Sequence, residues 1–195
     1  MSFQKIQLVN VGDKGVGKRA LLMTYTTGSF PDYIPAVFEN YNYFTEIDGK
    51  KYQIELWDTN GQEEYDNLRP LNYPSTNILL LHFSIDSPRS FESISSKWKP
   101  EVEHFIPNIP FILVGLKSDL REDKEYLKQL EEQGIKPITK EQGEAKAKEI
   151  GAAKYIECSA KNNFNVRYAI EEAVRNAKED NFSDSSDSYE ESDDE

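Results

Sequence analysis

The sequence predicts one α/β domain, built as a mostly parallel six-stranded sheet with helices on both faces. Segments with strand character alternate with helical segments, which is the order typical of a doubly wound sheet. Two strand segments, residues 77–84 and 110–116, are almost continuously apolar, as expected of central parallel strands buried on both faces. A glycine-rich loop between the first strand and the first helix is the third indication, because such loops hold phosphate groups.

The strands are predicted from apolar, β-branched runs. The second and third runs flank Asp48-Gly49, a pair that tolerates the positive φ of a tight turn, so these two strands should pair antiparallel. The others should belong to the doubly wound sheet, because helices separate them. The six predicted strands are residues 5–11, 41–47, 51–57, 77–84, 110–116 and 154–157.

The helices are predicted from amphipathic spacing and from end signals such as the Thr139 cap. A charged segment at residues 121–133 has helical spacing, which indicates an exposed, inserted helix. The other predicted helices are residues 17–27, 88–105, 139–150 and 165–178.

The charge of the chain is concentrated near its end. Nine acidic residues and no Lys or Arg fall in residues 179–195, which leaves −3 of the net charge of −12 for the rest. This segment has too little apolar surface to offset the entropy of ordering it. We therefore expect a folded domain over residues 1–178 and a disordered acidic, Ser-rich tail over residues 179–195.

Cys158 is the single cysteine, which excludes an internal disulfide, and the sequence has neither a signal peptide nor a long apolar run. We expect a cytoplasmic monomer without a nucleic-acid partner.

The sharpest motif is G-D-K-G-V-G-K-R at residues 12–19, between the first strand and the first helix. Glycines at these positions let backbone N–H groups turn inward around a polyphosphate, and the helix N-terminus adds a positive dipole. Lys18 can reach the terminal phosphates. The motif predicts a phosphate-binding loop, although Arg19 stands where the usual pattern has a hydroxyl residue.

Three further segments follow strands in the order that a nucleotide site needs. Asp58 ends the third strand, where its carboxylate can reach magnesium or a magnesium-bound water, and Gly61 can meet a third phosphate. Asp119 follows the fifth strand and can accept two hydrogen bonds from a guanine edge, while the Lys117 stem covers the base. The segment Ser159-Ala160-Lys161 can offer a backbone N–H to the guanine carbonyl.

Long segments of the chain resemble one family. They include Y-T-T-G-S-F-P from Tyr25, Y-I-P-A-V-F-E-N-Y from Tyr33, W-D-T-N-G-Q-E-E-Y-D-N-L-R-P-L-N-Y-P from Trp57 and A-K-E-I-G-A-A-K-Y-I-E-C-S-A-K from Ala147. On these segments and the insert helix, residues 4–178 resemble Ras-superfamily small GTPases, specifically the Rho family of the Rac type. The resemblance implies the phosphate-loop G-domain fold, GTP or GDP as ligand, and signalling to the actin cytoskeleton.

The resemblance also implies roles for single residues. Phe30 would pack over the base or ribose, residues 60–74 would form the second switch, and Gln62 would orient the attacking water. The first switch would bind effectors, and exchange factors and regulators would also contact the two switches. The first-switch residues are Tyr33, Ile34, Pro35, Ala36, Val37, Phe38, Glu39, Asn40 and Tyr41. The nucleotide-binding residues would be Asp13, Lys14, Gly15, Val16, Gly17, Lys18, Arg19, Ala20, Phe30, Tyr33, Ala36, Asp58, Gly61, Lys117, Asp119, Ser159, Ala160 and Lys161.

The magnesium site departs from the pattern of that family. Arg19 and Ala36 stand where the family has two magnesium-binding hydroxyls, and neither side chain offers an oxygen. We expect strongly weakened magnesium binding, with Asp58 as the remaining outer ligand. Two orientations of Arg19 stay open: its guanidinium pairs with phosphate oxygens, or it points to solvent.

Two other departures affect turnover and affinity. Lys14 stands at a family glycine beside the third phosphate, where a side chain should crowd the hydrolytic transition state. Leu116 replaces the Asn or Thr that opens the base-recognition motif. This change removes a polar contact between that loop and the rest of the site and should lower the affinity for nucleotide. We therefore expect slow or absent GTP hydrolysis.

The tail also differs from that of the family. Rho proteins typically end in a basic run and a prenylated cysteine, whereas this chain ends S-D-D-E. We expect no direct lipid anchor and membrane contact only through partners.

Two functional hypotheses follow. The first is a Rho/Rac-type switch that binds guanine nucleotide and effectors but hydrolyses GTP poorly. The second is a pseudo-GTPase scaffold with little or no nucleotide binding.

Overall fold

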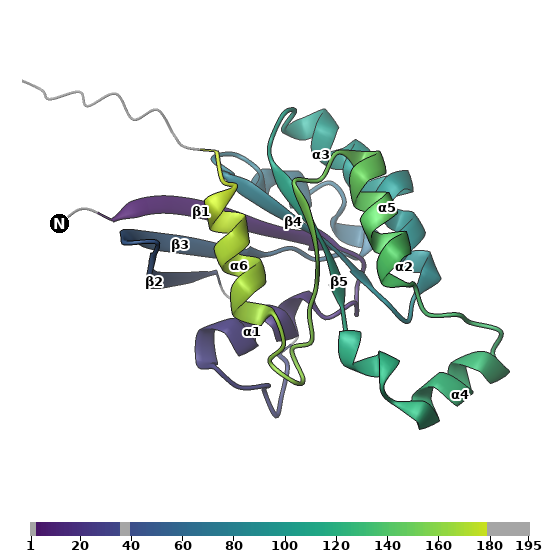
Figure 1. Cartoon of the computed structure of the whole chain (residues 1–195). Helices are drawn as coiled ribbons and strands as arrows, with labels where there is room; N and C mark the ends of the chain where they lie inside the picture. The colour runs from purple at the N-terminus through teal and green to yellow at the C-terminus, as the bar shows by residue number, and fades with distance from the viewer. Residues whose placement is uncertain (1–2, 36–39, 179–195) are drawn as a thin grey trace, which may run out of the picture.

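The computed structural model describes residues 3–35 and 40–178, and Figure 1 shows the sheet between two layers of helices. The strands are β1 Gln4–Gly12, β2 Tyr41–Ile47, β3 Lys50–Asp58, β4 Ile78–Ser84, β5 Phe111–Leu116 and β6 Lys154–Glu157. The helices are α1 Lys18–Thr27, α2 Pro88–Ser93, α3 Lys99–Phe105, α4 Lys124–Glu132, α5 Lys140–Ile150 and α6 Val166–Arg175. The expected tail and part of the expected first switch, residues 36–39, lie outside the described residues.

The sheet has the order β2-β3-β1-β4-β5-β6. All neighbours are parallel except β2 and β3, which pair antiparallel around the Asp48-Gly49 turn. Strands β4 and β5 are buried along their whole length, because helices cover both faces. The predicted mostly parallel α/β fold is confirmed.

Two apolar clusters form the core, one on each face of the sheet. Helices α1 and α6 cover the face that contains Leu8 and Ile54, and α2, α3 and α5 cover the face that contains Val9 and Phe83 (Figure 1). Alternate residues of each strand supply the two clusters, as the two-residue period requires. The carboxyl ends of the parallel strands therefore lie at one edge of a sheet that is packed between two layers of helices.

The helix predicted over residues 88–105 is one helical segment with a wider turn inside it. A π-helical turn, η3, spans Ile94–Trp98 between α2 and α3. Pro100 follows it, and proline has no backbone N–H and clashes with the carbonyl four residues earlier, which favours such a local widening. The turn places Trp98 in the core facing the phosphate loop.

The inserted helix is confirmed as α4, capped by the Asp123 side chain, which accepts from the backbone N–H of Tyr126 at 3.0 Å. It stands away from the two helical layers (Figure 1). Thr139 caps α5 as predicted, and Gln142 completes a capping box with it.

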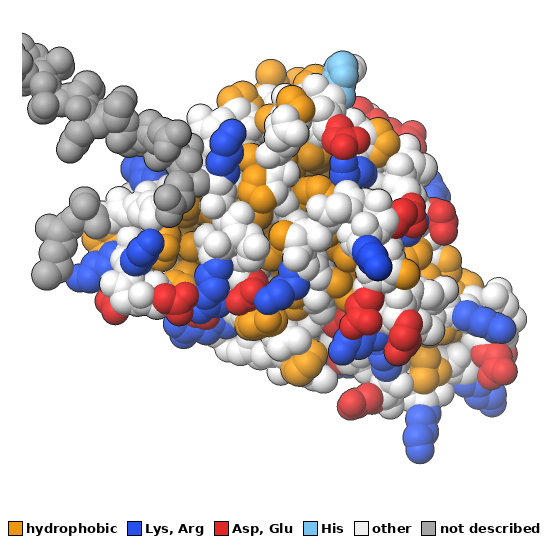
Figure 2. Space-filling model, turned by 45° about the horizontal axis from the view of Figure 1, so that its top comes forward, with side chains coloured by type: hydrophobic (Ala, Val, Ile, Leu, Met, Phe, Trp, Pro, Cys, Tyr) orange, Lys and Arg blue, Asp and Glu red, His pale blue; other side chains and the backbone are white. Residues whose placement is uncertain are grey.

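The surface in Figure 2 carries Lys, Arg, Asp and Glu side chains interspersed over one face. This mixture agrees with the small net charge of the chain outside residues 179–195. No helix among the described residues is long and apolar enough to cross a bilayer.

Candidate nucleotide-binding site

Two adjoining cavities lie at the carboxyl edge of the sheet, where ligands of open α/β sheets bind. The first, about 280 Å³, is the phosphate cavity, lined by the phosphate loop together with Asp58 and Gly61. The second, about 300 Å³, is the base cavity, lined by Phe30, Asp119 and other residues. Residues common to both linings are Gly15, Gly17, Ala20 and Ile34. Together the two cavities form one elongated site.

The phosphate loop is shaped by glycine. Gly15 and Gly17 have φ values of 80° and 111°, in the left-handed region that favours this residue. Gly61 approaches the same loop so closely that a Cβ there would lie 2.2 Å from the Gly12 carbonyl oxygen. The loop and the second switch are therefore in direct backbone contact.

Lys18 is the first residue of α1 and is buried beneath the loop. Its Nζ donates to the carbonyl oxygens of Gly12 at 2.7 Å and Asp13 at 2.9 Å. Burial lowers the pKa of Lys18 to about 8, and the nearby Asp58 and Asp13 carboxylates only partly oppose this shift. A bound polyphosphate would offer this ammonium group stronger acceptors than the two carbonyls.

Nucleotide affinity is expected to depend on pH through Lys18. Below about pH 8 the side chain is protonated with or without ligand, so affinity stays constant. Above that pH the free protein must take up a proton to bind phosphate, and affinity should fall by up to about tenfold per pH unit. Calorimetric titration of GDP at several pH values measures this. Lys18→Arg, which stays protonated, should flatten the profile, and an equal slope in both proteins would contradict the assignment.

The Arg19 side chain is 24% exposed and does not point to solvent, whereas its pairing with phosphate oxygens stays a prediction. Its Nε and Nη2 donate to Oδ2 of Asp58 at 3.0 and 2.8 Å, and its Nη1 donates to the Pro35 carbonyl oxygen at 2.6 Å. The Asp58 side chain is only 4% exposed, so this ion pair lies inside the phosphate cavity. Spacing along the chain cannot reveal the contact, because 39 residues separate the two partners.

In this cavity a guanidinium lies against the carboxylate expected to be the outer magnesium ligand, whereas magnesium takes six close oxygens in octahedral geometry. Asp58 Oδ2 is occupied by the guanidinium, while Oδ1 is buried without a hydrogen-bond partner among the described residues. Within that part of the chain, no group of three or more His, Cys, Asp or Glu side chains is arranged to hold a metal ion.

The base cavity keeps the predicted guanine-recognition residues together. Asp119 lines it with Phe30, Lys117, Ala160 and Lys161. Leu116 lines it too and packs under the phosphate loop, where a Cβ on Gly17 would lie 3.7 Å from Leu116 Cδ1. An apolar contact therefore stands where a side-chain amide or hydroxyl would make a hydrogen bond.

Ser159, which was predicted to bind nucleotide, is buried and does not line this cavity, but it supports a residue that does. Its Oγ donates to Oδ1 of Asp119 at 2.6 Å, and its own backbone N–H is bonded to the Phe164 carbonyl oxygen at 3.0 Å. A backbone donor to a guanine carbonyl would thus have to come from Ala160 or Lys161. Ser159 instead orients the Asp119 carboxylate.

Lys117 is connected to the inserted helix through Asp86. The Lys117 ammonium lies 3.6 Å from Oδ2 of Asp86, which also accepts from the Tyr126 hydroxyl of α4 at 2.7 Å. Burial opposes ionisation of Asp86, but hydrogen bonds from Ser84 and Tyr126 and the nearby Lys117 charge hold its pKa below its usual range. The inserted helix is therefore connected through Asp86 to Lys117, which lines the base cavity.

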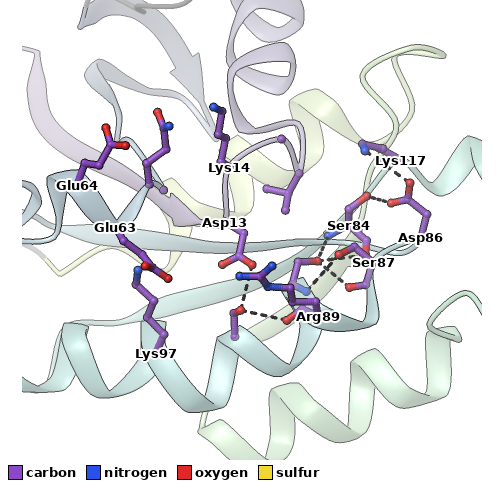
Figure 3. Close-up of a pocket in the computed structure, with 16 residues that line it drawn as sticks. Asp13, Lys14, Glu63, Glu64, Ser84, Asp86, Ser87, Arg89, Lys97 and Lys117 are labelled. Carbon is purple, nitrogen blue, oxygen red and sulfur yellow. Dashed lines mark hydrogen bonds and ion pairs between the residues drawn. The ribbon is translucent and has the colours of Figure 1, made fainter. Parts of the chain in front are cut away.

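Gln62 lines a third, larger cavity of about 600 Å³ that adjoins the phosphate cavity. Lys14, Gly15 and Gly61 line both cavities. Figure 3 shows Glu63 and Glu64 on one side of the larger cavity and Asp86 and Lys117 on the other. Gln62 is thus not among the residues that line the phosphate cavity, and its predicted catalytic role stays a prediction.

Arg69 connects the second switch, residues 60–74, to α3. This side chain is fully buried, pairs with Glu101 and Asp66 at 2.6 Å each, and stacks on Trp98. Trp98 in turn donates from Nε1 to Oδ1 of Asp13 at 2.7 Å. Phosphate loop, second switch and α3 thus form one connected network.

Several lining residues lie outside the nucleotide-binding set predicted from the sequence. Thr59 and Asn60 line the phosphate cavity, Leu120 lines the base cavity and Ile34 lines both. Tyr33, in contrast, is 75% exposed and lines neither cavity. Ala36, Val37, Phe38 and Glu39 lie outside the described residues, so their predicted roles stay predictions.

Comparison with known proteins agrees with this geometry. The Ras family profile matches residues 7–179. The chain is also 49% identical over 170 residues to the GTP-binding protein RHO1 of Saccharomyces cerevisiae, an alignment that covers 87% of this chain and 81% of that protein. The chain therefore belongs to the Ras family of small GTPases, and within it to the Rho family.

Proposed function

We propose that the protein is a Rac-like GTP-binding signalling switch that holds guanine nucleotide and presents its two switch segments to effectors and regulators, but hydrolyses GTP slowly or not at all. The observation that supports the binding half of this proposal is the pair of adjoining cavities, one lined by Lys18 and the other by Asp119. The name of the yeast relative, a GTP-binding protein, supports it.

Three positions support impaired hydrolysis. Lys14 carries a side chain at the boundary of the phosphate cavity, beside Gly61. Gln62 lines the larger cavity instead, and the Arg19–Asp58 pair stands at the expected magnesium position. Phosphoryl transfer depends almost wholly on positioning and charge neutralisation, so each departure slows it.

Lys14→Gly is expected to raise the rate of GTP hydrolysis by about tenfold, because it removes the crowding at the third phosphate. The measurement is single-turnover hydrolysis of GTP preloaded on the full chain. Lys14→Gly combined with Gln62→Ala is the matched control and should lose the gain. A wild-type rate already equal to that of Lys14→Gly would contradict the assignment of Lys14.

A second function is favoured by one specific contact. The Arg19–Asp58 pair satisfies a buried carboxylate with a protein cation, which suits a pseudo-GTPase that holds one conformation without nucleotide. Such a scaffold would bind partners equally well whether or not GTP or GDP is supplied, whereas the switch would bind them in one nucleotide state.

A further inference from the structure

Arg19 connects three segments that are far apart in the sequence. It is the second residue of α1, Asp58 is the last residue of β3, and Pro35 belongs to the first switch. One guanidinium donates to both of the other segments, at 2.8 Å to Asp58 Oδ2 and at 2.6 Å to the Pro35 carbonyl oxygen. The planar fork of arginine allows such contacts at once, whereas the single ammonium of lysine does not have this geometry.

The burial of this contact makes the cation structurally important. The Asp58 side chain is 4% exposed and that of Arg19 is 24% exposed. A carboxylate this buried requires a compensating charge, because its desolvation is otherwise not offset. The charge comes from the protein itself, at the place where the family resemblance would put a metal ion.

The same guanidinium lies beside the ligand. Arg19 and Lys18 both line the phosphate cavity, together with Gly15 and Gly17 of the phosphate loop. Two cations of the chain therefore face the space that phosphate groups would fill, and guanidinium pairs readily with phosphate oxygens.

We propose that Arg19 is the resident cation of the phosphate cavity: it supports guanine-nucleotide binding without a divalent metal and keeps residues 33–35 of the first switch attached to Asp58 when no metal is present. This inference rests on the proposed nucleotide binding for its first part. The second part, attachment of the first switch, concerns the chain alone. The consequence is that a protein cation, rather than the metal on the nucleotide, sets the position of residues 33–35.

The first experiment measures release of a fluorescent GDP analogue from the full chain in excess EDTA and in excess magnesium chloride. For the wild type the two release rates should agree within about threefold, and Arg19→Thr should release the analogue at least about tenfold faster in EDTA. Arg19→Lys, which keeps the charge and loses the fork, should lie between them. Arg167→Ala, which removes an exposed arginine of α6, is the matched control and should match the wild type. Acceleration of wild-type release by more than about tenfold in EDTA would overturn the metal-free binding mode.

The second experiment measures the rate of chymotryptic cleavage after Tyr33, which is 75% exposed and two residues before Pro35, in the nucleotide-free chain. Wild-type protein should be cleaved slowly with or without magnesium, and Arg19→Thr and Arg19→Lys should be cleaved faster. If no variant binds the GDP analogue but this difference persists, the proposed nucleotide function fails while the attachment of the first switch stands. Equal cleavage rates in wild type and both variants would overturn the attachment itself.

Discussion

Asp119→Asn is expected to lower the affinity for GDP by about a hundredfold or more and to create affinity for xanthosine diphosphate. The Asp119 carboxylate lines the base cavity and is oriented by the Ser159 hydroxyl. A carboxylate accepts hydrogen bonds from guanine N1–H and its 2-amino group, whereas an amide would place a donor opposite that amino group. Xanthine carries a carbonyl oxygen there, so the amide suits it.

Calorimetric titration of GDP and xanthosine diphosphate against wild type and Asp119→Asn measures this change. Glu125→Gln, a carboxylate-to-amide change in α4, is the matched control and should leave both affinities as in the wild type. An Asp119→Asn chain that still prefers GDP would place the base somewhere other than this cavity.

Arg69→Met is expected to destabilise the folded chain by about 3–5 kcal/mol, because removing one partner of a buried ion pair leaves the others uncompensated. The Arg69 side chain is fully buried, and it also donates to the carbonyl oxygens of Asn60 and Gln62 in the second switch. The variant should therefore loosen the second switch as well as lower the free energy of unfolding.

Urea denaturation of wild type and variant measures this loss. Arg175→Met is the matched control, because Arg175 pairs with Asp48 near the surface, where an ion pair contributes about 1 kcal/mol or less. Equal losses for the two variants would show that the buried network does not hold the second switch.

The sequence predicts most of the fold because each element carries a local signal. Continuous apolar runs indicate β4 and β5, and Asp48-Gly49 indicates the antiparallel hairpin. The wider turn at Ile94–Trp98 gives no such signal beyond Pro100, since a helix with this spacing reads as continuous.

The candidate site is harder to predict from the sequence than the fold is. The phosphate-loop residues can be predicted because glycine and lysine at this fixed spacing before a helix indicate a phosphate-binding loop. The partner of Arg19 and the support that Ser159 gives Asp119 depend on side-chain directions across segments 39 and 40 residues apart. Such contacts appear only when the chain is folded.

Guanine-nucleotide binding around a protein cation is tested most directly by identifying the nucleotide that the full chain retains. The chain is purified in excess EDTA and denatured, and the released nucleotide is identified by anion-exchange chromatography and quantified per chain. We predict a guanine nucleotide in near-stoichiometric amount. Absence of nucleotide, together with no binding of GTP or GDP on titration with or without magnesium, would contradict the claim.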